Sequence, residues 1–122
     1  MAFGTNIRTW FDGKWHDGDV MVMRAADHGI WQGSSVFDGA RWFDGMAPDL
    51  DRHCARVNRS AEAMMMTPNM DPDSMVQIAL EGLKGYAPDA AVYIRPMYWA
   101  AHGSEVGVAP LDTSTVFAMC LE

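Results

Sequence analysis

The segment from Ser35 to Met65 constrains the fold most, because a strand pattern, a turn and a helix pattern follow one another directly. Residues 35–43 alternate between two sets of side chains, as the residues of a strand do. Asp44-Gly45 predicts a turn, and residues 51–65 then repeat apolar side chains at helical spacing. The segment therefore predicts a helix packed on the sheet that the strand belongs to.

The two sides of this strand differ in character. A glycine inside it, Gly39, predicts a bulge or a close approach by another group. One side carries Val36, Asp38, Ala40 and Trp42, and the other carries Ser35, Phe37, Gly39, Arg41 and Phe43.

The helix that follows is expected to begin at Asp51, whose short carboxylate suits an N-cap, and to run to about Met65. Arg56 falls at the border of its apolar stripe. We expect Arg52, Arg59 and Glu62 on the far side, and His53, Val57, Ser60, Ala61 and Met64 on the inward stripe.

The rest of the chain predicts more strands and a second helix. Asp12-Gly13 between aromatic arms indicates a hairpin, and residues 19–23 read as a third strand. Residues 25–32 predict a short helical turn that ends at Gly33. Asp71 and Pro72 begin a helix that ends at Gly85, and strands follow at 91–101 and 114–121. We therefore expect residues 1–122 to form one α+β domain, with a mostly antiparallel sheet and two helices packed on it.

Composition argues against two classes of partner. The chain has 122 residues and a formal net charge of −7, whereas non-specific nucleic-acid binding rewards clustered Lys and Arg. No apolar run approaches the roughly 20 residues that span a bilayer.

Residues 1–8 lack a basic start followed by an apolar stretch, so we expect no signal peptide and a cytoplasmic protein. Cys54 and Cys120 show no pairing pattern, and the histidines show no metal-ligand spacing.

Three motifs carry a family resemblance. They are Ser35-Val36-Phe37-Asp38-Gly39, His53-Cys54-Ala55-Arg56-Val57 and Tyr93-Ile94-Arg95-Pro96. Together they resemble the fold-type IV pyridoxal-phosphate aminotransferases, the group of the branched-chain and D-amino-acid aminotransferases. The resemblance implies that residues 1–122 are the N-terminal small domain of a cytosolic homodimer. It also implies that a C-terminal large domain, which carries the cofactor-linked lysine, lies outside this sequence.

The resemblance gives roles to residues whose patterns alone leave the choice open. Arg56 by itself reads as a solvated surface residue, but the motif implies that it binds the phosphate of pyridoxal 5′-phosphate. Arg95 suits either a substrate carboxylate or an internal acid, and the motif favours substrate for both Tyr93 and Arg95. Phe37 reads as core or as a pocket aromatic. Gln32 stands where branched-chain enzymes often place tyrosine, which leaves an aliphatic substrate in doubt.

The implied function is a transaminase that moves an amino group between a branched-chain-like amino acid and a 2-oxo acid. An aminodeoxychorismate-lyase-like enzyme of the same fold is one alternative, and a non-enzymatic α+β domain that binds a small anion is another. Lys14 and Lys84, the two lysines, match no family motif, so we place no catalytic residue here and expect the 122 residues alone to be inactive. We expect Arg56 and Arg95 to converge on one anionic guest.

Overall fold

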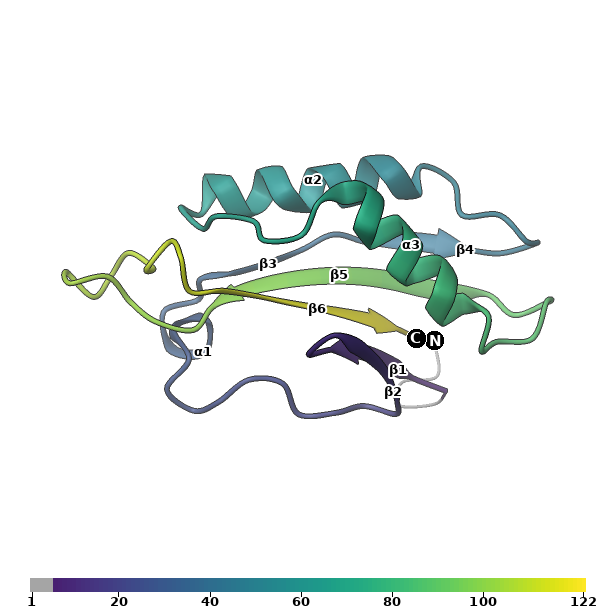
Figure 1. Cartoon of the computed structure of the whole chain (residues 1–122), viewed down its shortest axis with the longest axis horizontal. Helices are drawn as coiled ribbons and strands as arrows, with labels where there is room; N and C mark the ends of the chain where they lie inside the picture. The colour runs from purple at the N-terminus through teal and green to yellow at the C-terminus, as the bar shows by residue number, and fades with distance from the viewer. Residues whose placement is uncertain (1–5) are drawn as a thin grey trace.

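The computed structural model describes residues 6–122, which form a six-stranded sheet with two long helices on one face (Figure 1). The strand order is β2-β1-β6-β5-β3, β4 also pairs with β5, and every pairing is antiparallel. The elements are β1 (Arg8–Phe11), β2 (Lys14–Asp17), α1 (His28–Trp31), β3 (Ser35–Phe37), β4 (Ala40–Trp42), α2 (Leu50–Ala63), α3 (Pro72–Leu83), β5 (Val92–Ala100) and β6 (Thr115–Leu121). The predicted α+β fold is confirmed, and the short α1 lies within the helical turn predicted over residues 25–32.

Two expectations, that the chain has no signal peptide and no membrane-spanning segment, depend on which residues the structure describes. Residues 1–5 lie outside it, and with them most of the start on which the expectation of no signal peptide rests. Within residues 6–122, no helix has the length and apolar character that crossing a membrane requires.

The predicted hairpin forms around its Asp-Gly turn. Asp12 and Gly13 both have positive φ, at 54° and 83°, as a type I′ turn demands. The resulting register pairs Trp10 with Trp15 and Phe11 with Lys14. The sequence signal was sufficient here because two adjacent residues determine this turn.

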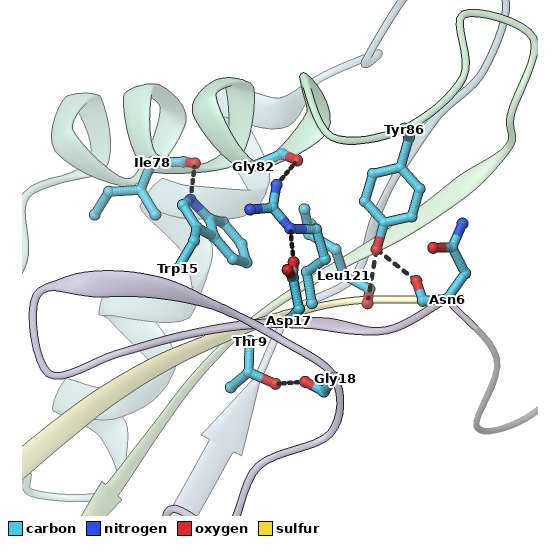
Figure 2. A network of polar contacts seen from close by, with 10 residues as sticks. Asn6, Thr9, Trp15, Asp17, Gly18, Ile78, Gly82, Tyr86 and Leu121 are labelled. Atoms are coloured by element: carbon cyan, nitrogen blue, oxygen red, sulfur yellow. Dashed lines mark hydrogen bonds and ion pairs between the residues drawn. The ribbon is translucent and has the colours of Figure 1, made fainter.

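Polar contacts fasten the hairpin to α3 (Figure 2). Trp15 and Arg8 donate to the carbonyls of Ile78 and Gly82, at 3.0 and 2.6 Å. Arg8 also donates to Asp17 at 3.2 Å, so its guanidinium joins both hairpin strands to the last turn of the helix. These bonds set the position of α3 over the β1 end of the sheet.

The apolar core lies between the sheet and α2 and α3. Tyr98 of β5 is fully buried there, and its hydroxyl donates to Asn58 of α2 at 2.8 Å. Its neighbours in β5 alternate: Ile94 is buried in this core, whereas Arg95 and Met97 turn to the opposite side of the sheet. The core also contains Ala40, Leu50, Cys54, Val57, Ala61, Met75, Ala79, Leu83, Val92, Phe117, Met119 and Leu121.

The predicted strand at residues 19–23 is wrong, because this segment pairs with no strand of the sheet. Gly18, with φ of 95°, turns the chain out of the hairpin. Val22 and Met23 then line a pocket on the helix-free side of the sheet, and Met21 is 98% exposed. Alternating apolar residues therefore cover a sheet face here instead of extending the sheet.

Helix α2 begins earlier than the sequence predicted. Its N-cap is Asp49 rather than Asp51, and Asp49 takes a left-handed conformation (φ 57°) without a side-chain capping bond. The buried stripe consists of Leu50, Cys54, Val57 and Ala61, so Val57 and Ala61 were predicted correctly. His53 lies at the margin of the stripe and Met64 is exposed, because the stripe is rotated towards Cys54.

Helix α3 begins as predicted. Asp71 accepts hydrogen bonds from the Ser74 amide at 2.9 Å and the Ser74 hydroxyl at 2.7 Å, and Pro72 is the first helical residue.

The predicted strand over residues 35–43 forms as β3 and β4, with a break at Asp38-Gly39. This break, foreseen as a bulge, is where the candidate site lies.

Candidate functional site

The break between β3 and β4 places a buried carboxylate against α2. Asp38 belongs to the strand side that faces the helices, and its side chain is only 4% exposed. Arg56 donates two hydrogen bonds to this carboxylate, from Nε to Oδ2 at 2.6 Å and from Nη2 to Oδ1 at 2.9 Å. His53 Nδ1 lies 2.7 Å from Oδ1, and the Gly39 amide donates to the same oxygen at 2.9 Å.

These contacts fix the protonation of Asp38. Burial raises the pKa of its carboxyl, but hydrogen bonds from Arg56, His53 and the Gly39 amide outweigh burial and lower the pKa to about 2. Its hydrogen bonds and its charge in turn raise the pKa of Arg56. Asp38 is therefore an anion near neutral pH that can only accept, so His53 carries its proton on Nδ1.

Arg56 also borders a cationic cavity on the outer side of α2. The cavity has a volume of about 290 Å³ and is lined by Asp49, Arg52, His53, Arg56 and Arg59. Arg52 and Arg59 were expected to point away from Arg56. They share the cavity because residues three and four positions apart are neighbours on a helix surface. Among residues 6–122, Arg59 forms no ion pair with an acidic side chain.

Three of the other predicted residues, Phe37, Tyr93 and Arg95, lie on the helix-free side of the sheet. Phe37 and Arg95 line a pocket of about 280 Å³ together with Met97 and Trp99. Arg95 also lies over the Tyr93 ring, 5.6 Å from its centroid, and its Nη1 is 3.4 Å from a carboxylate oxygen of Glu122. The pocket combines apolar walls with one guanidinium, a combination suited to a small apolar molecule that carries an acid.

Gly39 connects the two regions. A Cβ added to Gly39 would lie 2.9 Å from Cζ of Tyr93, so the Tyr93 ring occupies the space that a side chain would need. This confirms the predicted close approach. Asp38 contacts Arg56 on the helix side of the sheet, and Gly39 contacts the Tyr93 ring on the opposite side. Because Arg95 lies over that ring, an unbroken chain of contacts leads from Arg56 to Arg95.

The two arginines do not share a cavity. Arg95 does not line the cavity of Arg56, and Arg56 does not line the pocket of Arg95, because they lie on opposite sides of the sheet. The expected convergence on one guest is therefore not met by this chain alone. Gln32 lies outside both cavities, at the exposed C-cap of α1.

Neither lysine lies in these cavities. Lys14 pairs with Phe11 beside the hairpin turn, and Lys84 caps α3 and forms an exposed ion pair with Glu81 at 3.1 Å. The sequence reasoning missed Asp38 and His53 as members of the site. A signal was present, because Asp38 falls on the same strand side as three apolar residues, and a buried carboxylate requires partners.

Comparisons with known proteins agree with the motifs. Residues 35–122 match the family model described as amino-transferase class IV. A probable branched-chain-amino-acid aminotransferase of Rickettsia bellii is 28% identical over 113 residues, which cover 89% of this chain and 38% of the relative. A putative branched-chain-amino-acid aminotransferase of Methanocaldococcus jannaschii is 28% identical over 78 residues, which cover 64% of this chain and 27% of the relative.

A solved structure is similar over almost the whole chain. It is a crystal structure of an aminotransferase from Brucella abortus bound to the cofactor PLP, with 52% sequence identity and a TM-score of 0.94. The match covers 96% of this chain and 42% of that one. The chain thus spans less than half the length of these relatives.

Proposed function

Because the chain belongs to the amino-transferase class IV family, we propose that it is the N-terminal small domain of a pyridoxal-5′-phosphate-dependent transaminase. In this proposal the whole enzyme moves an amino group from an amino acid to a 2-oxo acid, and a larger second domain carries the cofactor-linked lysine. The likeness to a cofactor-bound Brucella abortus aminotransferase supports the transaminase, and the match to only 42% of that chain supports a longer whole enzyme. The homodimer and the cytoplasmic location implied by the resemblance belong to the same proposal.

The cavity at Arg56 suits the phosphate of the cofactor. A phosphate offers several acceptor oxygens and about two negative charges, and Arg56 retains donors that Asp38 does not use. Arg52 and Arg59 add positive charge around the same space. When bound, pyridoxal phosphate supplies the electron sink that makes bonds at the α-carbon of an amino acid labile. In this division of roles, Arg56 binds and orients, and the chain itself moves no proton.

The pocket at Arg95 suits the substrate. Arg95 supplies donors for a carboxylate, and Phe37 supplies an apolar wall. Tyr93, whose ring lies against Arg95 but does not line this pocket, is proposed as a second donor. Because Asp38-Gly39 joins the two regions, a long guest could lie around this edge of the sheet, with its phosphate at Arg56 and its carboxylate at Arg95. The proposal therefore replaces a shared cavity with a guest that bridges two of them.

The preferred substrate is proposed to be a branched-chain-like amino acid. The apolar walls of the pocket and the names of the two curated relatives support this class. Gln32 is exposed beside Trp31, so this chain places no amide in the apolar pocket. Amino transfer to 2-oxoglutarate, without pyruvate elimination, distinguishes the transaminase from the lyase alternative.

The observation that carries the proposal is the cationic cavity at Arg56, within a chain of this family. The test compares Arg56→Ala, Arg95→Ala and the control Lys84→Ala in the full-length protein. Arg56→Ala is expected to weaken binding of pyridoxamine 5′-phosphate roughly tenfold or more, with little effect on pyridoxamine. Arg95→Ala is expected to raise KM for the amino acid. The proposal would be overturned if Arg56→Ala bound pyridoxamine 5′-phosphate as tightly as the Lys84→Ala control does, and Arg95→Ala had the same KM as that control.

The 122 residues alone are expected to be inactive, since neither lysine lies near the cavities. Incubation with pyridoxal phosphate and borohydride should give no stoichiometric adduct at a specific lysine. A stoichiometric adduct at Lys14 or Lys84 would contradict this expectation.

A further inference from the structure

Asp38 is the most buried charged group beside the Arg56 cavity. It does not line the cavity itself, because its carboxylate points into the contacts with α2. Both of its oxygens are occupied by Arg56, and one of them also receives His53 and the Gly39 amide. Four donors therefore converge on one carboxylate, and two of the donating side chains border the cavity.

We propose that Asp38 is a positioning residue that aims Arg56 into the cavity so that its free donors bind a phosphate group. The inference rests on the proposed function, because the phosphate in question is that of the cofactor. It adds a residue that contacts no ligand and acts only through Arg56.

The hydrogen-bond count shows how the positioning works. A guanidinium has five N–H donors in one plane. Asp38 takes the Nε donor and one Nη2 donor, which leaves the two Nη1 donors and one Nη2 donor for a guest. Because the guanidinium is planar and gripped at two points, these three donors have fixed directions.

The exposure of Arg56 explains why it needs such a partner. Its side chain is 59% exposed, so packing alone does not select one rotamer. An arginine that is free to rotate loses side-chain entropy when it binds an anion, and a guanidinium fixed beforehand loses less. His53 has a supporting part, since its Nδ1–H donates to Asp38 and helps to hold the carboxylate in place beside Arg56.

Positioning and simple electrostatics predict effects of opposite sign. Asp38 carries a negative charge next to the cavity, so removing that charge should strengthen anion binding if only the field mattered. If Asp38 positions Arg56, removing the charge should weaken anion binding. The direction of the change in affinity therefore separates the two roles.

The test uses the full-length protein with pyridoxamine 5′-phosphate, and with pyridoxamine as the probe that lacks phosphate. Asp38→Asn is expected to weaken binding of the phosphorylated probe roughly tenfold and to leave pyridoxamine binding nearly unchanged. Asp38→Glu, which keeps the charge, is expected to restore part of the affinity. Asp51→Asn on the exposed side of α2 is the control for loss of one carboxylate, and it should bind as the wild type does.

A second measurement needs no variant and no cofactor. In the wild-type protein, the Nε–H of Arg56 should give an NMR signal that exchanges slowly with water, unlike that of Arg59, which forms no ion pair with an acidic side chain among residues 6–122. A fast-exchanging Arg56 signal would overturn the proposal even if Asp38→Asn failed to fold. Equal or tighter phosphate binding by a folded Asp38→Asn would also overturn it.

The outcomes separate this inference from the proposed function. If Arg56→Ala loses phosphate affinity and Asp38→Asn does not, only the positioning role fails. If Arg56→Ala keeps full affinity, the phosphate contact itself fails, and the positioning role fails with it.

Discussion

Replacing Asp38 with asparagine tests the buried ion pair through the pH dependence of stability. The pKa of Asp38 falls from an ordinary value of 3.8 to about 2 in the folded protein. Each unit corresponds to about 1.4 kcal/mol, so ionised Asp38 stabilises the fold by roughly 2 kcal/mol near neutral pH. A lowered folded-state pKa means that this stabilisation is present above about pH 4 and is lost as the pH falls towards 2.

The expected size of the effect follows from the same two values. Between pH 5 and pH 2.5 the wild-type protein should lose roughly 1–2 kcal/mol of this contribution, whereas asparagine does not titrate. The assay is urea denaturation of both proteins at both pH values. The difference in unfolding free energy between wild type and Asp38→Asn should shrink by that amount at pH 2.5. Asp27 and Asp71, whose pKa values are also lowered, cancel because both proteins contain them.

An unchanged difference between the two proteins at pH 5 and pH 2.5 would refute this reasoning. It would mean that Asp38 has an ordinary pKa and that Arg56 and His53 do not hold its charge. Asp51→Asn provides the control, because Asp51 lies on the helix that carries Arg56 and forms no ion pair among residues 6–122. The difference in unfolding free energy between wild type and Asp51→Asn should not shrink in the same way between pH 5 and pH 2.5.

Two further substitutions test other parts of the structure. Gly39→Ala should displace the Tyr93 ring and destabilise the protein by about 1–2 kcal/mol, and an unchanged melting temperature would contradict that close contact. Asp71→Ala removes the N-cap bonds to Ser74 and should reduce the unfolding free energy by about 1 kcal/mol, whereas a loss below the error of a urea titration would contradict the capping role.

Local signals predicted the elements that depend on a few adjacent residues. Asp12-Gly13 determines the hairpin turn, and Asp71-Pro72 determines the start of α3. The segment at residues 19–23 misled because an alternating apolar pattern does not distinguish a paired strand from a chain that covers a sheet. The start of α2 was misplaced because Asp49 adopts a left-handed conformation that its sequence neighbours do not require.

The sequence identified most residues of the candidate site, but it did not predict how those residues are arranged relative to one another. Phe37, Tyr93 and Arg95 fell on one side of the sheet, as alternation required. The contact between Asp38 and Arg56 joins residues 18 positions apart, and only the packing of α2 on β3 brings them together. Helical spacing could have grouped Arg56 with its neighbours in the cavity, but the relation of that cavity to the pocket of Arg95 required the folded sheet.

The central claim is that this chain holds a phosphate at Arg56 and a carboxylate at Arg95, on either side of the Asp38-Gly39 break. A crystal structure of the full-length protein with pyridoxamine 5′-phosphate and a 2-oxo acid tests it most directly. The account predicts the phosphate within hydrogen-bond distance of Arg56, which still grips Asp38, and the acid's carboxylate at Arg95. A phosphate bound elsewhere, with Arg56 directed to solvent, would contradict it.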